Sequence, residues 1–470
     1  MENKNGLTFG VKDRPKAAQL IIFALQQLLA IMAATIAVPA IVGHGMSSSA
    51  ALFGAGVGTI VYLLFTKFRS PVFLGSSFAF LGSMAAAFGG AVSASAGYLG
   101  LIIGAVLAGL VYVVIAIIVK FAGTAWINKL MPAVIIGPTV AIIGLSLAGN
   151  AIGDVMGVGA GCSKWIAMLC GFVTLFVTII CSVYGKKMFK LIPFVIGILS
   201  GYALAAIFTL IGNSAGIAEL QVINFDLFNN IQWYPDFTFL TAFSGNYDFG
   251  AGGFGAYLGS IAVAYIPVAF VVFAEHIADH KNLSSIIGSD LLEDPGLHRT
   301  LLGDGVGSMA GAFFGGCPNT TYGESIGCVA ITGNASVISI FAAACMAIVI
   351  SFIGPFSTFL ATIPSCVMGG VCIALYGFIA VSGLKMLQKV DLNDNTNLFV
   401  VSVILIAGVG GFFISFGDPA NPTVTITEVA CALILGIITN LICSRARKNK
   451  AEVATDNTSA NAEVKEAKEE

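Results

Sequence analysis

Long apolar stretches recur along this chain, and they constrain its possible folds more than any other feature of the sequence. An α-helix needs about 20 mainly apolar residues to cross a bilayer, and the stretch from Leu20 to Val42 is long enough to do so. Only 10% of the 470 residues are charged, whereas a soluble domain has about 25%. Apolar side chains that face lipid need no polar cover, so the sequence predicts an all-α polytopic membrane protein.

We predict fourteen transmembrane segments from the hydropathy of the sequence. Two of them, 71–90 and 319–333, are interrupted by Ser, Thr, Gly or Pro, which is unusual for a plain helix. The fourteen predicted segments are 18–42, 48–66, 71–90, 97–121, 130–149, 165–184, 191–212, 257–279, 300–316, 319–333, 335–354, 363–383, 397–416 and 426–444.

The basic residues indicate how these segments are oriented. Lys and Arg collect in every second connection, for example Lys67 and Arg69, while the stretch from Leu191 to His280 contains neither residue type. Cytoplasmic loops of membrane proteins carry this excess of Lys and Arg. We therefore predict that both termini are cytoplasmic, with residues 1–17 and a disordered, charged tail at 445–470 on the inner side.

Three acidic residues, Glu275, Asp279 and Glu324, lie inside predicted spans, whereas nearly every other acid lies in a loop or a tail. A charge at the centre of a bilayer costs at least about 2.5–3.5 kcal/mol, so such residues usually mark the path of an ion or a substrate. The alternative is a structural ion pair, but no Lys or Arg lies in the interior of any predicted span. Asp304 and Glu428 fall at span ends, where we expect solvated side chains.

Glu275 and Asp279 are four residues apart and therefore share one face of a helix. Two carboxylates that repel each other in a low dielectric favour a state in which one of them holds a proton. We interpret this pair as the carrier of a coupling proton. His276 and His280 point elsewhere on the same helix, and we expect ordinary interfacial histidines there rather than a proton relay.

The two interrupted segments resemble each other. One contains Pro71-Val-Phe-Leu-Gly-Ser-Ser-Phe-Ala-Phe80, and the other contains Pro318-Asn-Thr-Thr-Tyr-Gly-Glu324. Each has a proline, paired hydroxyl residues, an aromatic residue and a small residue, and the two fall seven predicted spans apart. Because an odd number of spans inverts the second half of a repeat, the similarity indicates an inverted repeat unless the stretches match by chance. Interrupted helices also leave backbone groups that can hold a polar substrate.

Motifs for enzymatic or metal chemistry are missing from the sequence. The ten cysteines show no paired spacing, so we expect neither disulfides nor a metal site. No His-Glu-x-x-His motif, histidine-rich cluster or nucleophile elbow occurs, and Ser76 and Ser77 have no nearby base in the sequence. We therefore expect a protein that is not an enzyme and that uses no metal or other cofactor, with a proton as its coupling ion.

Five stretches of the sequence match the motifs of a known family. They are Leu25-Gln-Gln27, Leu74-Gly-Ser-Ser-Phe-Ala-Phe80, Ala274-Glu-His276, Asp290-Leu-Leu-Glu-Asp-Pro-Gly-Leu-His-Arg299 and Pro318-Asn-Thr-Thr-Tyr-Gly-Glu324. The last two are highly specific, because they are long and rich in residues that are uncommon in membrane proteins. With these stretches the chain resembles the nucleobase–ascorbate transporter family, and within it the bacterial uracil–proton symporters, over nearly the whole membrane region.

This resemblance implies a fold of fourteen spans arranged as two inverted repeats of seven, with short extended pieces in spans 3 and 10. It also implies a core domain that carries the substrate and a gate domain through which such proteins form homodimers. The core domain would comprise 18–122 and 257–355, the gate domain 130–213 and 363–444, and an extracytoplasmic loop 214–256.

The resemblance also implies site residues, position by position. The implied substrate-binding residues are Glu275, Glu324, Phe78, Gly323, Tyr322, Ala34 and Tyr376. The two glutamates would accept hydrogen bonds, Phe78 and Gly323 would offer backbone groups, and the remaining three would line the pocket. The sequence departs from the family pattern at Gln26-Gln27, which replaces a Gln-His pair, and at Asp279, where uracil carriers often have His. The second departure favours a proton carried by the two span-8 carboxylates over a histidine relay.

The function that this resemblance implies is uracil import by proton symport and alternating access in a bacterial inner membrane. Uracil has two N–H donors and two carbonyl acceptors on a flat ring, which suit carboxylates, backbone N–H groups and aromatic walls. A xanthine or urate permease of the same family stays open as an alternative. An anion carrier of the same fold is disfavoured by the two acids at the site, and a passive channel by the buried carboxylates. No nucleic-acid partner is expected, because no basic stripe occurs.

Overall fold

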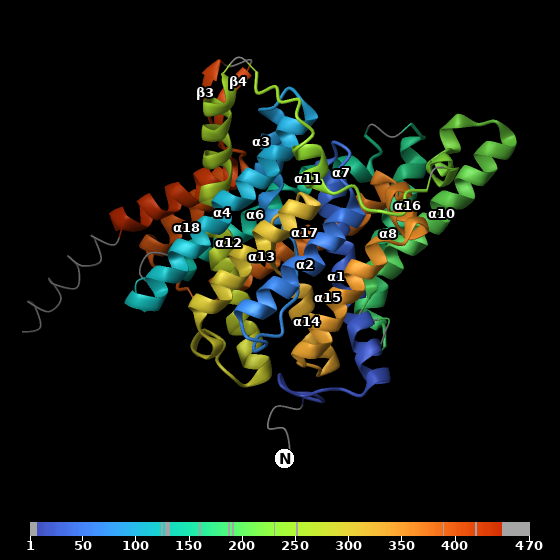
Figure 1. Cartoon of the computed structure of the whole chain (residues 1–470). Coiled ribbons are helices and arrows are strands. Elements are labelled where there is room, and N and C mark those ends of the chain that lie inside the picture. Colours follow the sequence, from blue (N-terminus) through green and yellow to red (C-terminus); the bar gives the residue numbers. More distant parts are fainter. Residues whose placement is uncertain are drawn as a thin grey trace, which may run out of the picture.

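Helices form most of the chain in the computed structural model (Figure 1). The described residues are 7–123, 126, 132–158, 161–186, 189, 192–229, 231–250, 252–388, 390–418 and 421–443. The predicted cytoplasmic tail at 445–470 and the first six residues of the predicted segment 1–17 lie outside these described residues.

Eight helices of the described chain are long and apolar enough to cross a membrane, and a bent pair makes a possible ninth. The eight are α1 (Ala17–Val42), α2 (Ser48–Phe65), α4 (Ala94–Ala122), the α6–α7 unit (Ala133–Ser146 and Ala148–Val155), α8 (Lys164–Tyr184), α10 (Pro193–Ala215), α12 (Gly253–Ile287) and α17 (Ser365–Leu387). The bent pair is α15 (Val337–Ser351) with α16 (Gly354–Thr362), whose axes differ by 84°. The chain is therefore a mainly helical multi-pass membrane protein.

Six further helices, most of them shorter, complete the part of the helical structure that the described residues show. They are α3 (Leu81–Gly89), α11 (Thr238–Ala242), α13 (Leu297–Gly315), α14 (Gly323–Thr332), α18 (Asn395–Val409) and a last helix at Glu428–Cys443. Most predicted segments match these helices to within a few residues. The clearest difference is α12, which continues eight residues beyond the predicted end at Asp279, because the polar run that follows still forms regular helical turns.

Two short strands, β1 (Leu74–Ser76) and β2 (Asn319–Thr321), pair antiparallel inside the helical structure. Their residue pairs are Leu74 with Thr321, Gly75 with Thr320 and Ser76 with Asn319. Each strand follows a proline and leads directly into a helical segment, which is the short turn η1 (Phe78–Phe80) before α3 in one case and α14 in the other. The extended pieces expected in the two interrupted segments are therefore present. Their pairing satisfies backbone groups that lipid could not satisfy.

Helices α2 and α13 lie very close together beside these strands because small residues face each other across their interface. A Cβ atom added to Gly58 would lie only 2.7 Å from the backbone oxygen of Gly307, and one added to Gly307 would lie 2.7 Å from the oxygen of Gly58. The side-chain amide of Asn319 in β2 donates a hydrogen bond to the oxygen of Gly54 in α2, at 2.9 Å. The glycines thus let two helix backbones and a strand approach one another, as is common in membrane proteins.

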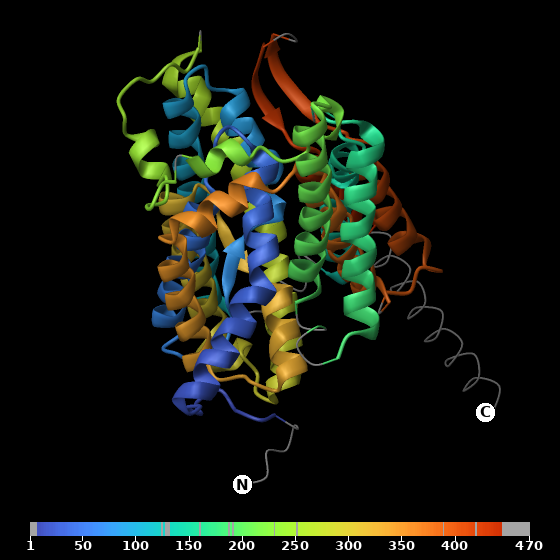
Figure 2. The same ribbon diagram turned by 90° about the vertical axis from the view of Figure 1, so that its right-hand side faces the viewer.

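The helices form two groups by their packing contacts. Helices α1, α2, α3, α4, α12, α13, α14 and α15 pack mainly on one another, and α6, α7, α8, α10, α17 and α18 form the second group. Contacts between the groups are sparser and come mainly from α1 and α12. Figure 2 shows α8 and α10 (teal and green) standing beside the blue and yellow helices of the first group. Two cavities of several hundred Å³ lie at the boundary between the groups.

A hairpin of β3 (Ile414–Asp418) and β4 (Asn421–Ile426) was not expected from the sequence (Figure 1). The predicted segment 397–416 is wrong at its end, because α18 stops at Val409 and the chain turns at Gly410 and Gly411. Gly411 has a φ of +66°, in the left-handed region that commonly terminates a helix.

Candidate functional site

A cavity of about 340 Å³ lies between the two helix groups and contains all three of the acids that the sequence places inside spans. We call it the carboxylate cavity. Its volume lies within the usual range of about 300–1,000 Å³ for small-molecule sites. Its lining residues are Ala30, Val140, Pro193, Phe194, Glu275, Ala278, Asp279, Gly323, Glu324, Gly327, Cys328, Ile331, Phe378, Ile379, Ser382 and Met386.

The three carboxylates reach this cavity from two elements of the first helix group. Glu275 and Asp279 come from one face of α12, as their spacing predicts, and Glu324 comes from the first turn of α14. All three side chains are half-buried. The hydroxyl of Thr321, the last residue of β2, donates a hydrogen bond to Asp279 Oδ2 at 2.7 Å. This bond fixes one carboxylate of α12 to the strand that precedes α14.

The backbone at the start of α14 is open toward the cavity. Gly323 is the first residue of this helix, and a Cβ atom added there would meet no other atom within 4 Å. The same holds for Gly327, one turn later, which also lines the cavity. The first N–H groups of a helix have no partner within the helix and carry a partial positive charge. This end of α14 can therefore donate hydrogen bonds to a carbonyl group of a ligand, beside the acceptor oxygens of Glu324.

The other sequence-predicted site residues are buried around the strand pair rather than on the cavity wall. Tyr322 donates from its hydroxyl to the backbone oxygen of Ser76 at 2.6 Å and so ties β2 to β1. Phe78 lies edge-on to Tyr376, with ring centroids 5.6 Å apart, and this contact joins the two helix groups. Ala34 is buried in α1, and the residue of α1 that lines the cavity is Ala30, one turn earlier.

Sequence reasoning missed the apolar side of the cavity. Phe194 of α10 and Phe378 of α17 line it, and their rings contact each other with centroids 5.9 Å apart. These residues come from the second helix group, and the sequence offers no signal for them. An aromatic or aliphatic residue in an apolar span looks the same whether it faces lipid, a neighbouring helix or a ligand.

On the side of α12 opposite Glu275 and Asp279, the structure contradicts two expectations about where buried and solvated side chains lie. His276 and His280 are fully buried and are not interfacial, and Asp304 is 1% exposed rather than solvated at a span end. His276 Nδ1 lies 2.7 Å from Asp304 Oδ2, and its Nε2 lies 3.0 Å from the hydroxyl of Thr300. Thr300 and Asp304 are four residues apart on α13, and this shared face was the available signal.

The buried polar contacts extend from His280 to α2. Its Nε2 lies 2.7 Å from the hydroxyl of Tyr62, which donates to the hydroxyl of Ser70 at 2.7 Å. The rings of His276 and His280 are stacked with centroids 4.0 Å apart. One face of α12 is thus fixed by buried histidines, while the other presents Glu275 and Asp279 to the cavity.

The motif at 290–299 forms the turn between α12 and α13 and does not line the carboxylate cavity. Asp290 Oδ1 accepts a hydrogen bond from the backbone N–H of Leu292 at 2.8 Å. Arg69, in the connection after α2, forms an exposed ion pair with Asp294 at 2.6 Å. The motif therefore forms the connection from α12 to α13 and links it to the connection after α2.

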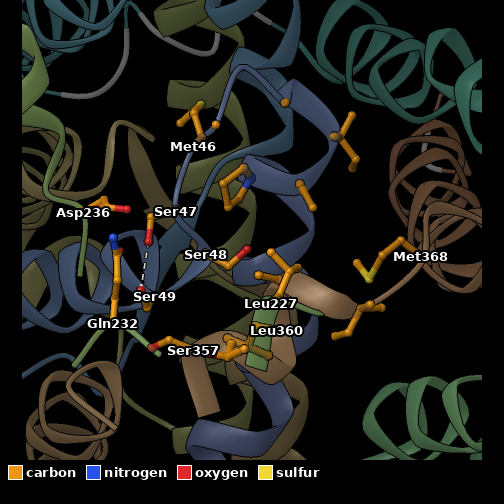
Figure 3. Close-up of a pocket in the computed structure, with 18 of the residues that line it drawn as sticks. Met46, Ser47, Ser48, Ser49, Leu227, Gln232, Asp236, Ser357, Leu360 and Met368 are labelled. Carbon is orange, nitrogen blue, oxygen red and sulfur yellow. Dashed lines mark hydrogen bonds between the residues drawn. The ribbon is translucent and has the colours of Figure 1, made fainter. Parts of the chain in front are cut away.

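A second, larger hollow of about 600 Å³ lies at the opposite end of the boundary between the helix groups (Figure 3). Met368, near the start of α17, lines this hollow, whereas Met386, near the end of α17, lines the carboxylate cavity. Its wall contains both polar and apolar side chains, and the hydroxyls of Ser47 and Ser49 lie 2.8 Å apart within it. We call it the opposite hollow.

A small apolar cluster separates these two spaces along α1. Its buried members are Met32, Ile36, Val195 and Leu360, from α1, α10 and α16. Ala30, just before the cluster on α1, lines the carboxylate cavity, and Pro39, just after it, lines the opposite hollow. Along α1 this cluster therefore lies between the two spaces, and one of its members, Leu360, also lines the opposite hollow.

These features together define what the site can bind. It offers carboxylate acceptors, backbone donors at a helix start and two phenylalanine rings, which suit a small planar molecule with both N–H and C=O groups. Among the described residues, no group of three or more His, Cys, Asp or Glu side chains is arranged to hold a metal ion.

Comparisons with known proteins identify the family of the chain. A sequence profile described as "permease family" matches residues 18–416. The chain is 39% identical over 458 residues to the uracil permease of Bacillus subtilis (strain 168), which covers 96% of this chain and 99% of that protein. It is 40% identical over 434 residues to the uracil permease of Bacillus caldolyticus, covering 92% and 94% of the two chains. The uracil permease of Escherichia coli (strain K12) is 36% identical over 437 residues, covering 92% and 93%.

Solved structures of other transporters share the fold. The transmembrane domain of the cyanobacterial bicarbonate transporter BicA aligns with a TM-score of 0.59 at 14% identity, covering 93% of this chain and 99% of that one. The murine anion transporter Slc26a9 aligns with a TM-score of 0.60 at 11% identity, covering 93% and 69%. Such low identities establish only a common architecture. The profile match and the permease relatives establish more, namely that this chain is a membrane transporter, not an enzyme, and that it belongs to the nucleobase–ascorbate transporter family.

Proposed function

We propose that this protein imports uracil together with a proton across a bacterial inner membrane. The main observation behind the proposal is the composition of the carboxylate cavity. Glu275, Asp279 and Glu324 line it together with Gly323, whose backbone has open space beside it. Relatives that are 36–40% identical over most of the chain are uracil permeases, which supports uracil as the cargo.

The groups in the cavity complement those of uracil. The ring N–H groups can donate to Glu275 and Glu324, and a ring carbonyl can accept from the backbone N–H groups at the start of α14. Phe194 and Phe378 offer apolar surface to the ring. An unmatched polar group in such a site costs about 1–3 kcal/mol, so a molecule with a different donor pattern would bind roughly tenfold to hundredfold more weakly. Phe78, Tyr322, Tyr376 and Ala34 support this site from behind in our proposal.

Proton coupling follows from the acids that line the site. No Lys or Arg is among the residues that line the carboxylate cavity, so nothing there neutralises Glu275, Asp279 and Glu324 by an ion pair. We assign the coupling proton to Glu275 and Asp279, which share one face of α12. No organic cofactor is required for this cycle.

Alternating access is supported by the arrangement of the two spaces. In our proposal the first helix group is the core domain and the second is the gate domain, in a fold of fourteen spans built from two inverted repeats. The paired β1 and β2, each at the start of a helix, are what such a repeat would place at its centre. Movement of one group against the other would open the apolar cluster and connect the site to the opposite hollow. Both termini would be cytoplasmic, and the gate domains of two copies would form a homodimer.

A purine such as xanthine or urate is a second candidate for the cargo. Asp279 favours it, because this acid lines the cavity and adds an acceptor that a purine's additional N–H groups could use. The outcome of competition between the ligands separates the two candidates.

Uptake of radiolabelled uracil into proteoliposomes that contain the purified protein tests the proposal directly. An inward proton gradient should drive uracil above its external concentration, and a protonophore should abolish this accumulation. Unlabelled uracil should compete, whereas xanthine and urate should not. Accumulation that xanthine or urate blocks at lower concentrations than unlabelled uracil does would assign a purine instead. Equilibration without accumulation under a proton gradient would exclude proton symport.

A further inference from the structure

A small void lies between α4, α13 and β2, and it shares no lining residue with the carboxylate cavity or the opposite hollow. Its volume is about 10 Å³, which is close to the space that one water molecule needs. The residues around it are Phe80, Ala108, Gly109, Tyr112, Asp304, Gly305, Ser308, Asn319 and Thr320. Most of the exposed wall is apolar, but five of the residues around the void carry a hydroxyl, carboxylate or amide group, which the voids that stay dry lack.

Two polar atoms at this void have no hydrogen-bond partner within the described part of the chain. They are Asp304 Oδ1 and the hydroxyl oxygen of Tyr112. Both side chains are more than nine-tenths buried. The other oxygen of the carboxylate, Asp304 Oδ2, is already engaged by His276 Nδ1 at 2.7 Å. Buried polar groups nearly always have a partner, and Asp304 and Tyr112 both line this void, which has about the size of a water molecule.

We propose that this void binds one ordered water molecule, which donates to Asp304 Oδ1 and accepts from the hydroxyl of Tyr112. Its second hydrogen is available to the hydroxyl of Ser308 or Thr320, which also line the void. Buried waters typically make about three hydrogen bonds of this kind. The proposal does not depend on which molecule the protein transports.

The water would hold three elements in place around the transport site. Tyr112 belongs to α4, Asp304 and Ser308 to α13, and Thr320 to β2. With Oδ1 occupied, the carboxylate of Asp304 keeps Oδ2 directed at His276, and His276 in turn fixes α12 from the face opposite Glu275 and Asp279. The water is thus a positioning element that reaches the site through a buried pair and does not touch the substrate.

A structure of the full-length protein in lipid nanodiscs, at about 2 Å resolution, tests the site directly. We expect a single density peak within hydrogen-bonding distance of Asp304 Oδ1 and the Tyr112 hydroxyl. The peak should be lost in Tyr112→Phe. It should persist in Tyr265→Phe, a matched control, because Tyr265 is equally buried, also has an unpartnered hydroxyl, and does not line the void. A wild-type structure in which Asp304 Oδ1 bonds to another protein group and the void has no peak overturns the proposal.

Thermal melting of the same variants gives an independent readout. If Tyr112 bonds to the water, Tyr112→Phe removes a satisfied hydrogen bond and lowers the melting temperature by a few degrees. If its hydroxyl had no partner, removing it would leave the melting temperature unchanged or raise it, and that result would overturn the proposal. Tyr265→Phe should not lower it. Replacement of sodium by choline in the buffer should change nothing, whereas a sodium-dependent stabilisation that is lost in Tyr112→Phe would assign a bound cation in place of water.

Discussion

Glu324 is one of the three carboxylates that face the proposed ligand. It lines the cavity from the first turn of α14, beside the open backbone of Gly323. Glu324→Gln keeps the size of the side chain but replaces a charged acceptor by an amide. A hydrogen bond to a charged group contributes about 1.5–3 kcal/mol, so uracil affinity should fall roughly tenfold to hundredfold.

The measurement is equilibrium binding of labelled uracil to purified protein. Glu293→Gln is a suitable control, because Glu293 lies in the turn between α12 and α13 and does not line the cavity. Unchanged affinity in Glu324→Gln would remove this side chain from the binding site.

Gly323 allows a test that separates ligand contact from folding. A methyl group at this position would project where no protein atom lies within 4 Å, so Gly323→Ala should leave the melting temperature unchanged. It should weaken uracil binding, because the methyl group occupies space that the ligand needs at the helix start. Gly377→Ala adds a methyl group in equally open space outside the cavity and should change neither property. Equal affinity for Gly323→Ala and wild type would place the ligand elsewhere.

At the residue scale, the sequence predicted the charged groups of the cavity better than their neighbours. Glu275, Asp279 and Glu324 were identifiable because a charge in an apolar span is costly and therefore rare. His276 and Asp304 were misjudged because each lies near the polar end of its span, where solvation is the ordinary expectation. Their pairing depends on the rotation of α12 against α13, which spacing within one helix does not specify.

Among the elements, the strand pair is the smallest unit that holds the site together. Tyr322 contributes twice, because its ring packs against Gly75 and its hydroxyl donates to the oxygen of Ser76. Tyr322→Phe keeps the ring and removes only the bond from β2 to β1. Since a neutral hydrogen bond contributes about 0.5–1.5 kcal/mol, we expect a modest loss of thermal stability and a several-fold loss of uracil affinity.

The comparison that decides this prediction is between two phenylalanine variants. Tyr202→Phe removes the hydroxyl that lies 2.8 Å from that of Thr362, far from the strands in sequence and in a different helix group. It should cost similar stability with unchanged uracil affinity. If both variants reduce affinity equally, the strand pair has no special part in binding.

Sequence patterns predicted the broken segments, but they did not predict the β3–β4 hairpin or the end of α12. The two broken segments were recognisable because proline, paired hydroxyl residues and glycine interrupt an apolar run, and the structure pairs their strands antiparallel. The β3–β4 hairpin was missed because its alternation is short and adjoins two apolar helices. The end of α12 was missed for the opposite reason, since its last two turns are polar but still helical.

On the scale of the whole molecule, the main feature of this conformation is that two separate spaces lie along the boundary between the helix groups. Met32 and Ile36 lie between the carboxylate cavity and the opposite hollow along α1, and they pack against Val195 and Leu360. Sequence analysis could predict neither space, because each is formed by residues from both groups that are distant in the chain. In a transporter, the coupling of substrate movement to proton movement depends on every step of the transport cycle. A residue can therefore be dispensable for substrate binding and still be needed for accumulation of the substrate.

Asp279→Asn tests this separation of binding from coupling. The asparagine oxygen can still accept the hydrogen bond that Thr321 donates at 2.7 Å in the wild type, so the link between α12 and β2 should survive. Glu275 and Glu324 remain to bind uracil, while the second carboxylate of the proposed proton pair is gone. We therefore expect affinity to change little, proton-driven accumulation of uracil to fall at least tenfold, and exchange of internal for external uracil to remain measurable.

Thr321→Val provides the complementary change, because it removes the hydrogen bond and keeps the carboxylate. It should weaken the position of β2 without abolishing accumulation. If Asp279→Asn instead loses binding and exchange together, Asp279 contacts the ligand or maintains the fold. If accumulation is undiminished, the coupling proton is carried by Glu275 without its neighbour. The ratio of accumulation to exchange, measured in the same proteoliposomes, distinguishes these outcomes because exchange requires movement of the loaded carrier but no net transfer of protons.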